Sequence, residues 1–363
     1  MSMLKVTINL VVLNGEKYIR HFLDAVLAQT YPHELIEFNI LDNGSLDNTI
    51  GIIENFKFKI LNSKFPKFDL VKSKSNLGMW PGQEELLKRS SCKYVLAVAV
   101  DVILDKDFIK NAVEVMERDE KIGALQAKIY RYELTDLQPT TYNLQPTIID
   151  TFGFKIFKSR RLVNMGHGEK DIGQYDPPSG GSVEIFGVEG AAPFFRKSAL
   201  ESCRIPLPTT HYQLPTNEIF DHDYFWYGDD FDLAWRMNLF GWKQIFAPAV
   251  IAWHDRQTTK TLRKNWMDFI RIRREVPMRK RGLDWRNTRF TILKNDYIIN
   301  ILKDLPYILK REIMLFGYIL IFEPRVLSEV PNFLRFFPKM LRKRREIMSR
   351  AKVGPNEIGK WFS

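Results

Sequence analysis

Apolar and β-branched runs alternate with amphipathic stretches along the first third of the chain. The runs Val6 to Leu13, Ile36 to Leu41 and Tyr94 to Val100 have the continuous apolar character of strands that are buried on both faces of a sheet. Apolar residues recur at helical spacing in Tyr18 to Leu27 and again in Phe108 to Met116. Strands that alternate with helices predict an α/β fold with a mostly parallel, doubly wound central sheet.

A polar residue follows each of the three predicted strands, namely Asn14, Asp42 and Asp101. In open parallel sheets, ligands bind outside the carboxyl ends of the strands. Solvated loop residues would explain each polar residue singly, but three consecutive strand ends favour a shared site. We therefore expect these side chains to line a ligand site at one edge of the sheet.

The stretch from Phe225 to Arg236 combines three aspartates and an arginine with aromatic neighbours. Carboxylates that lie close together repel one another, which raises the pKa of at least one of them. Such a group suits a general base or a ligand of a divalent cation. The alternative is the start of a helix with Asp229 or Asp230 as its N-cap. The residues by themselves leave both interpretations open.

The segments around this stretch carry further candidate residues. From Arg131 to Val183, proline, glycine and mixed polar residues predict long loops that carry binding work. The small residues Gly190 and Ala191 permit either the close approach of a ligand or close packing of a helix. A strand-like run, Ala249 to Trp253, ends at His254. That histidine, next to an acid, is a candidate metal ligand, and a structural role is the alternative.

Composition and cysteine usage restrict the class of protein. With 363 residues, 45% of them apolar, the chain can bury a large core and is long enough for two domains. Only Cys92 and Cys203 are present, which gives no disulfide framework and points to a reducing compartment. The first residues lack the pattern of a signal peptide. The longest apolar run, Ile313 to Phe322, is about half of what a membrane-spanning helix needs. We therefore expect a cytoplasmic protein that does not cross a membrane.

Positive charge is concentrated towards the C-terminus. Residues 263–363 contain 24 Lys and Arg against 10 Asp and Glu, whereas the whole chain contains 54 against 43. Basic clusters such as Arg342 to Arg345 alternate with apolar stripes such as Phe336-Phe337, a pattern typical of helices that lie in a membrane interface. Four prolines are expected to divide this region into short helices: Pro306, Pro324, Pro331 and Pro338.

We expect this basic helical region, residues 259–363, to associate with a membrane surface. The alternative is a solvated helical cap on the rest of the protein, because charge runs often only form a surface. Nucleic-acid binding is the other partnership that such charge permits. We do not expect it, since no recognisable binding module accompanies the charge.

Short motifs, in their order along residues 4–256, resemble the family 2 inverting glycosyltransferases with the GT-A fold, particularly the rhamnosyltransferase-like members. Each motif has little specificity by itself, and the ordered series carries the resemblance. The motifs are Val11-Val12-Leu13-Asn14, Leu27-Ala28-Gln29-Thr30-Tyr31-Pro32, Asp42-Asn43-Gly44-Ser45 with Asp47 and Thr49, Asn76-Leu77-Gly78, Asp101-Val102, Gly190-Ala191, Asp229-Asp230-Phe231-Asp232-Leu233 with Arg236, and Gly241-Trp242 leading to His254.

The resemblance implies a Rossmann-like GT-A catalytic domain over residues 1–258, with a nucleotide-sugar half near 1–130 and an acceptor half near 131–258. It implies a nucleotide-sugar donor, dTDP-rhamnose or a UDP-sugar. It also implies Mg²⁺ or Mn²⁺ on the diphosphate, held by Asp101 and His254. The residues implied for donor binding are Asn14, Asp42, Asn76, Gly78 and Asp101.

For the transfer step, the resemblance implies that Asp230 is the catalytic base. It would take the proton from the acceptor hydroxyl as that oxygen attacks the anomeric carbon, which inverts the anomeric centre. Asp229 stands where the family usually has Glu and would support Asp230. Asp232 and Arg236 would fix the loop by pairing. The residues implied on the acceptor side are Gly190, Ala191, Asp232 and Arg236.

With the basic region, the resemblance implies a lipid-linked or polysaccharide acceptor and an enzyme bound peripherally to the inner face of the cell membrane. Two positions depart from the family pattern. Ala99 stands where the first acid of the metal motif is expected, and water can fill that position on Mg²⁺. Gln83 stands where the rhamnosyltransferase-like members have Asn.

Two other functions remain open. One is a catalytically degenerate, sugar-nucleotide-binding membrane scaffold, which the missing acid at Ala99 motivates. The other is a sugar nucleotidyltransferase, which needs a glycine-rich, basic loop to hold a triphosphate after the first strand. Asn14-Gly15-Glu16-Lys17 is a poor version of such a loop.

Overall fold

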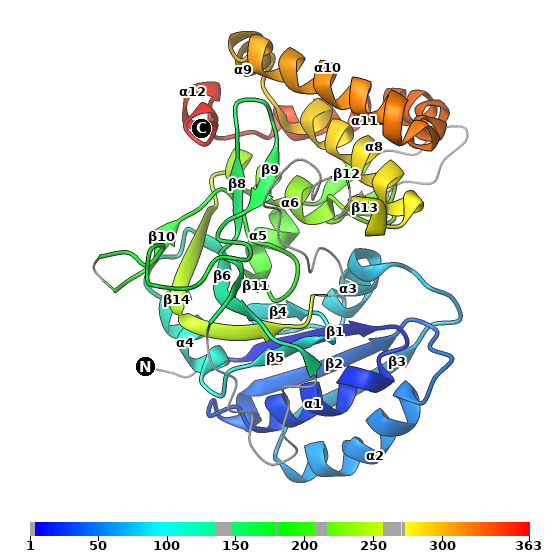
Figure 1. Cartoon of the computed structure of the whole chain (residues 1–363). Coiled ribbons are helices and arrows are strands. Elements are labelled where there is room, and N and C mark those ends of the chain that lie inside the picture. Colours follow the sequence, from blue (N-terminus) through cyan, green and yellow to red (C-terminus); the bar gives the residue numbers. More distant parts are fainter. Residues whose placement is uncertain (1–3, 135–146, 179, 208–215, 257–269, 271–272) are drawn as a thin grey trace. The chain divides into compact units, whose positions relative to one another are not determined.

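The computed structural model describes residues 4–134, 147–178, 180–207, 216–256, 270 and 273–363 (Figure 1). They fall into two compact units, each made of segments that are distant in sequence. The first unit comprises Met1–Phe154, Asn164–Glu201 and Trp242–Arg256, and the second comprises Lys155–Val163, Ser202–Gly241 and Gln257–Ser363. The predicted boundary at residue 258 lies outside the described residues. Residues 202–241, which the prediction assigned to the first domain, belong to the second unit.

Among the described residues, a ten-stranded sheet forms the centre of the first unit. Its strands are β1 (Val6–Val12), β2 (Ile36–Asp42), β3 (Lys67–Lys72), β4 (Tyr94–Val98), β5 (Val102–Leu104), β6 (Ile122–Arg131), β7 (Ile149–Thr151), β10 (Val183–Glu184), β11 (Phe194–Arg196) and β14 (Lys243–His254). The strands follow the order β10-β14-β6-β11-β4-β1-β2-β3, with β5 also beside β14 and β7 beside β6. The pairs β1–β2, β1–β4, β2–β3 and β6–β14 are parallel, whereas β11 is antiparallel to β4 and β6.

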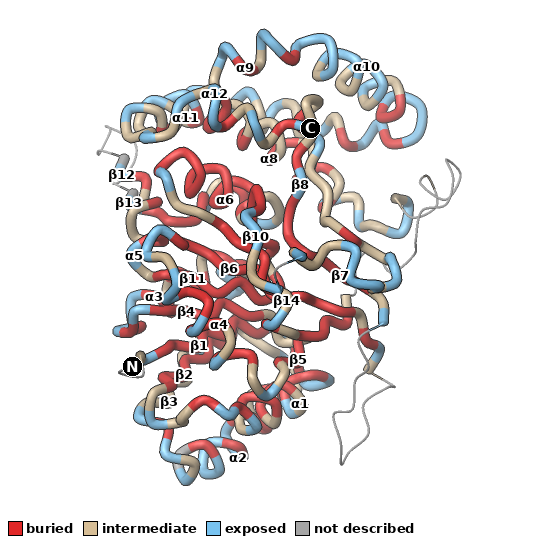
Figure 2. The backbone as a smooth tube through the Cα atoms, turned by 90° about the vertical axis from the view of Figure 1, so that its left-hand side faces the viewer, coloured by how far each residue is buried: buried red, intermediate tan, exposed pale blue. Residues whose placement is uncertain are grey.

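Helices cover both faces of this sheet. Neighbouring residues of a strand point to opposite sides, so a continuous apolar strand places apolar side chains on both faces. Leu10 of β1 belongs to a large core with α1 (Glu16–Leu27), α2 (Thr49–Asn62) and α4 (Phe108–Met116). The next residue, Val11, packs with Leu86 of α3 (Met79–Leu87) in a separate cluster. Figure 2 shows the strands as mostly buried. The predicted α/β fold with a mostly parallel central sheet is confirmed.

The predicted strands are present in the structure, but some of their bounds differ. Strand β4 ends two residues before the predicted end at Val100, and β14 is longer than the predicted run from Ala249 to Trp253. The segment expected to form long loops contains β7 and the short pair β8 (Phe154–Ile156) and β9 (Leu162–Asn164). Residues 155–163 of that pair belong to the second unit.

The second unit is mainly helical. Its chain end is fixed by Phe362, which forms a bridge with Ile156 and packs its ring against Trp235. None of the described helices is long and apolar enough to cross a bilayer. The elements of this unit are β12 (Ile205–Leu207), β13 (Thr216–Glu218), α6 (Asp229–Leu239), α8 (Met278–Asn295), α9 (Ile298–Lys303), α10 (Leu305–Phe322), η3 (Pro324–Glu329), α11 (Val330–Ser349) and α12 (Pro355–Gly359).

The prediction that Pro338 interrupts a helix is wrong, because α11 continues through it. Buried residues beyond the proline, Met340 and Lys343, anchor the second half of the helix. The other three prolines lie in the first turn of an element, where the missing N–H costs no helical hydrogen bond. They are Pro306 in α10, Pro324 in η3 and Pro331 in α11.

Candidate active site

The loops after β1 and β2 interlock at the carboxyl edge of the sheet. Asn14 has a φ of 50°, a left-handed conformation that Asn adopts more readily than most residues. Its backbone N–H donates to Ser45 Oγ over 2.8 Å, and its Oδ1 accepts from the backbone N–H of Leu46 over 2.8 Å. The backbone N–H of Gly15 donates to Thr49 Oγ1 over 2.8 Å. The two loops therefore support each other.

The loop after β3 joins the same edge through Asn43. Asn43 Nδ2 donates to Asn76 Oδ1 over 2.9 Å and to the carbonyl oxygen of Gly78 over 3.2 Å. The neighbouring Asp42 is buried, and its carboxylate accepts backbone N–H groups of its own loop, including that of Ser45 at 3.2 Å. Four predicted donor-binding positions, those on the loops after β1, β2 and β3, are thus held in one hydrogen-bonded assembly.

Asp101 and His254, the predicted metal ligands, also lie together. His254 ends β14, which pairs with β5 so that His254 lies opposite Val102. Its Nε2 lies 3.5 Å from Asp101 Oδ2, and its Nδ1 lies 2.9 Å from Asp150 Oδ2. Burial alone would lower the pKa of His254, but the carboxylates of Asp101 and Asp150 raise it to about 10. The imidazole is therefore held between two acids.

A chain of ion pairs continues from Asp150 to the predicted acceptor side. Asp150 is fully buried, and Arg256 donates to its Oδ1 from Nε over 2.7 Å and to its Oδ2 from Nη2 over 2.9 Å. Burial opposes ionisation, yet Arg256 and His254 hold the pKa of Asp150 far below its usual range. Arg256 also bonds Glu189, whose other oxygen accepts the backbone N–H of Ala191 over 2.9 Å. We call Asp101, His254, Asp150, Arg256 and Glu189 the histidine cluster.

The histidine cluster fits a divalent cation with few protein ligands. A carboxylate on Nδ1, as Asp150 provides, is the arrangement that orients a metal-binding imidazole. A cation would replace the proton on Nε2 of His254, since the metal binds neutral imidazole. The described residues contain no group of three or more His, Cys, Asp or Glu able to hold a metal ion. The backbone N–H of Ala99 donates to the carbonyl oxygen of Ala191 over 2.9 Å. The side chain of Ala99 has no carboxylate that could bind a metal ion. Diphosphate and water oxygens would have to complete such a site.

Gln83 serves the fold of the first unit. It is buried on α3, and its Nε2 donates to the backbone carbonyl of Asn9 in β1 over 3.0 Å. Asn9 in turn accepts from Asn39 over 3.0 Å. The position at which the sequence departs from the rhamnosyltransferase-like pattern thus ties a helix to the sheet.

The predicted base, Asp230, lies in the first turn of α6 in the second unit. Its side chain is partly exposed, whereas the neighbouring Asp229 is only 2% exposed. Burial, and then the charge of Asp230, raise the pKa of Asp229 well above its usual value. Among the described residues, no hydrogen-bond partner reaches Asp229 Oδ2. Asp229 therefore retains its proton more strongly, and Asp230 is the more accessible carboxylate of the two.

The loop that precedes these aspartates is strained and firmly held. Phe225 and Tyr227 have φ values of 63° and 67°, which are unusual for aromatic residues. From α8, Asn287 Nδ2 donates to three carbonyl oxygens of this loop: those of Tyr224 at 3.1 Å, Trp226 at 2.9 Å and Tyr227 at 2.7 Å. Because Asn287 is fully buried, these bonds are shielded from water. Helix α8 thus determines where the chain enters α6.

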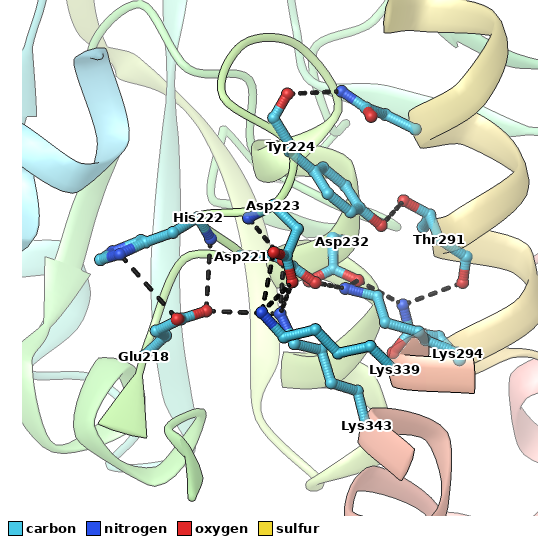
Figure 3. Close-up of polar contacts among 12 residues, drawn as sticks. Glu218, Asp221, His222, Asp223, Tyr224, Asp232, Thr291, Lys294, Lys339 and Lys343 are labelled. Carbon is cyan, nitrogen blue, oxygen red and sulfur yellow. Dashed lines mark hydrogen bonds and ion pairs between the residues drawn. The ribbon is translucent and has the colours of Figure 1, made fainter. Parts of the chain in front are cut away.

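A second buried group of charges, the lysine cluster, connects α6 to α8 and α11 (Figure 3). Lys343 Nζ lies 2.5 Å from Asp221 Oδ1, and Lys294 pairs with both Asp221 and Asp232. Burial opposes ionisation, but the two lysines hold the pKa of Asp221 far below its usual range. The members are Glu218, Asp221, Asp223, Asp232, Arg236, Lys294, Lys339 and Lys343.

Asp232 and Arg236 pair with each other, as the resemblance implies. Arg236 Nε lies 3.0 Å from Asp232 Oδ2, and neither side chain is exposed to solvent. Arg236 Nη2 also donates to the backbone carbonyl of Ile219 over 2.6 Å. This geometry supports the role of fixing the loop, and contact of these two side chains with an acceptor stays a prediction.

Sequence reasoning did not single out Asn43, Asp150, Glu189, Arg256 or Asn287 as site residues. For Asp150 a signal was present, because the residue follows the β-branched run Thr147-Ile148-Ile149 as Asp101 follows a strand-like run. For Asn287 no local signal exists, because its partners lie 60 to 63 residues away in the sequence.

Comparison with known proteins finds a family match in the first half of the chain. Residues 7–175 match the model of the family described as Glycosyl transferase family 2. Over 192 residues, the chain is 29% identical to poly-beta-1,6-N-acetyl-D-glucosamine synthase of Staphylococcus epidermidis, covering 48% of this chain and 45% of that protein. Over 112 residues, it is 30% identical to poly(ribitol-phosphate) beta-N-acetylglucosaminyltransferase TarS of Staphylococcus aureus, covering 30% and 18%. The chain thus matches less than half of the length of either relative.

Solved structures share the fold over nearly the whole chain. The mannosyltransferase PcManGT from Pyrobaculum calidifontis, in complex with GDP-Man and Mn²⁺, has a TM-score of 0.52 at 14% identity and covers 99% of this chain and 86% of that one. TarS 1–349 of S. aureus in complex with UDP has a TM-score of 0.50 at 15% identity, covering 98% and 90%. At these identities the likeness shows a common GT-A-like fold. Residues 7–175, just under half of the chain, thus match Glycosyl transferase family 2, and the chain is similar in sequence to the two staphylococcal enzymes.

Proposed function

We propose that this chain is an inverting glycosyltransferase, which moves a sugar from a nucleoside-diphosphate donor to a hydroxyl group of a lipid-linked or polysaccharide acceptor. The observation that carries the proposal is the hydrogen-bonded assembly of Asn14, Asp42, Asn76 and Gly78 within a Glycosyl transferase family 2 domain. It lies at the carboxyl edge of parallel strands, where α/β sheets bind nucleotides.

Asp230 is the proposed base. It accepts the proton of the acceptor hydroxyl while the oxygen forms a bond to the anomeric carbon. The bond between that carbon and the diphosphate oxygen breaks on the opposite side, and the nucleoside diphosphate leaves. The partial exposure of Asp230, beside a buried Asp229 that retains its proton, supports this division of roles.

Asp101 and His254 are the proposed metal ligands, for Mg²⁺ or Mn²⁺. Such a cation, when bound, neutralises negative charge on the diphosphate as it leaves. Asp150 holds the imidazole in place from the other side. The Mn²⁺ in the complex of PcManGT supports a divalent cation here.

For the donor, we propose a UDP-sugar, with UDP-N-acetylglucosamine as the first candidate. The two staphylococcal relatives support it, since one is named as a poly-N-acetylglucosamine synthase and the other as an N-acetylglucosaminyltransferase. The alternative is dTDP-rhamnose, which rests on the motif resemblance. Calorimetric titration with UDP and dTDP, each with and without Mn²⁺, separates the two. Binding that requires the metal and is lost in Asp101→Ala would support the proposed donor site.

The base is tested by Asp230→Asn, with Glu120→Gln as a control at an exposed acid of the first unit. We expect Asp230→Asn to lower kcat by about 10²- to 10⁴-fold, the usual contribution of a general base. Donor binding should remain unchanged in both variants. Normal turnover by Asp230→Asn would disprove the assignment of the base.

A second candidate is a sugar-nucleotide-binding scaffold without transfer activity. It is favoured by Ala99, which supplies no carboxylate, and by the direct pairing of Asp101 with His254. Nucleotide binding by the wild type, without hydrolysis or transfer to any of a panel of acceptors, would support the scaffold over the enzyme. For either function we propose a peripheral location on the inner face of the cell membrane, which the basic composition of residues 259–363 supports.

A further inference from the structure

Helix α10 exposes an apolar stripe along its whole length. Its members, Leu305, Leu309, Ile313, Phe316 and Leu320, follow one another at intervals of three or four residues and so share one side of the helix. Their exposed fractions run from 37% to 70%. Figure 2 shows exposed stretches along α9 and α10. Large apolar side chains gathered on one surface mark an interaction site more often than scattered ones do.

A second stripe lies further around the same helix. Tyr307, Met314 and Ile321 are seven residues apart and are exposed to 54%, 62% and 73%. The opposite side of α10 is already used, because Tyr318 and Ile319 are buried in a small core with η3. The exposed stripes are therefore not needed to hold α10 in its own unit. We call the two stripes, together with exposed Ile298, Ile299 and Leu302 of α9, the α9–α10 face.

The charges around the α9–α10 face are positive. Lys303, Lys310 and Arg325 are exposed, and no ion pair among the described residues involves them. In contrast, every acid between Ile298 and Arg325 is neutralised by arginine. The pairs are Asp304 with Arg160, Glu312 with Arg289 and Arg311, and Glu323 with Arg273 and Arg281.

We propose that the α9–α10 face docks into the headgroup region of a lipid bilayer that contains anionic lipids. An apolar face with basic residues on and beside it, on a helix too polar to span the membrane, is the pattern of a helix that lies in the interface plane. A second copy of the chain is the other possible occupant. It would bury positive charges from both copies on a face whose acids are already paired, whereas an anionic surface attracts Lys303, Lys310 and Arg325.

This surface differs from the basic run that the sequence suggested, Arg342 to Arg345. Lys343 is buried in the lysine cluster, and Arg344 Nη1 donates to the backbone carbonyl of Leu293 over 2.6 Å. Two of the four basic side chains of that run therefore bind other groups of the protein. The docking proposal rests on the proposed membrane location and not on the transfer reaction.

The test is co-sedimentation of the full chain with vesicles of phosphatidylcholine and phosphatidylglycerol in equal amounts, and with vesicles of phosphatidylcholine alone. The wild type should bind the mixed vesicles more tightly. The double variant Ile313→Asp/Ile321→Asp should lose at least tenfold in affinity. Phe58→Asp is a matched control, because Phe58 on α2 is 72% exposed and lies outside the α9–α10 face. It should bind as the wild type does.

A charge variant tests the contribution of the exposed basic residues. Replacing Lys303, Lys310 and Arg325 with Gln should weaken binding to the mixed vesicles by about fivefold for each charge. This factor corresponds to the usual gain in binding free energy of one basic residue near an anionic leaflet. Equal melting temperatures of all variants would show that folding is intact.

Three results would overturn the docking proposal. The first is equal vesicle binding by the Asp double variant and the wild type, and the second is no vesicle binding by the wild type. The third is a wild-type oligomer that forms without lipid, is seen by light scattering and is absent in the double variant, with no binding to vesicles. The assay contains no donor or acceptor. A failed docking test therefore leaves the transferase proposal intact, and failed transfer to a soluble acceptor leaves docking intact.

Discussion

The histidine cluster of the first unit and the lysine cluster of the second are both buried networks of ion pairs, but they end differently. In the histidine cluster, the last carboxylate, that of Asp101, is 20% exposed. In the lysine cluster, Asp221, Asp232, Arg236 and Lys294 are all 0% exposed. The first network thus ends at groups that a ligand can reach, whereas the centre of the second is closed.

This difference separates a candidate site from a structural device. Buried charges in both networks have strongly shifted pKa values, as Asp150 and Asp221 show. Perturbed ionisation alone therefore does not identify a functional residue, because a structural network perturbs it equally. What distinguishes His254 is that one nitrogen is fixed by a buried acid while the other faces a partly exposed one.

The largest effect is expected from breaking the closed network. Lys343→Met would leave Asp221 with one buried cation fewer, and an uncompensated buried charge costs about 3–5 kcal/mol. The free energy of unfolding, measured with urea, should fall by that amount. Arg342→Met, at the exposed neighbouring position, is the matched control and should change it by less than about 0.5 kcal/mol. Equal effects of the two substitutions would show that the network is not closed in solution.

A smaller and different effect is expected in the open network. Asp150→Asn removes the carboxylate that orients His254, and loss of such a partner typically lowers metal affinity by about 10- to 100-fold. Calorimetry should show this loss in the binding of UDP with Mn²⁺, while binding of UDP without metal stays the same. Asp69→Asn, in a surface ion pair with Arg89, serves as the control. Unchanged metal-dependent binding by a folded Asp150→Asn would remove His254 from the proposed metal site.

The sequence could predict that the proposed donor-binding residues lie together, because local rules determine their positions. Apolar runs locate β1, β2 and β4, and parallel pairing then places Asn14, Asp42 and Asp101 at one edge. No comparable rule links Asp150 to Arg256, which lie 106 residues apart and meet only through tertiary structure. The fold class was accordingly predictable, whereas the ion pairs behind the predicted ligands were not.

The lysine cluster was predictable in part, from helical spacing. Met340, Lys343 and Ile347 are spaced by three and four residues, so they share one side of α11, and all three are buried. The charge of Lys343 within a basic run led to the prediction of a membrane-facing residue. Its position between two apolar residues of the buried stripe was the better guide. The periodicity predicts on which side of the helix a side chain lies, whereas its charge alone does not.

The smallest expected effect concerns Asp229, which lies near the closed network without being neutralised by it. Burial, and then the charge of Asp230, raise its pKa, so the folded protein keeps a proton that the unfolded chain releases above about pH 4. The stability of the wild type should therefore decline as the pH rises from that value towards the raised pKa. Asn cannot ionise, so Asp229→Asn should melt a few degrees above the wild type at pH 8, and the two melting temperatures should converge as the pH falls towards 4. Thermal unfolding followed by circular dichroism across this range measures the gap, with Glu120→Gln as a variant whose gap stays small at every pH. A gap for Asp229→Asn that is the same at pH 4 and pH 8 would mean that Asp229 ionises as an ordinary aspartate, and that the start of α6 is as open to water as the end of the histidine cluster.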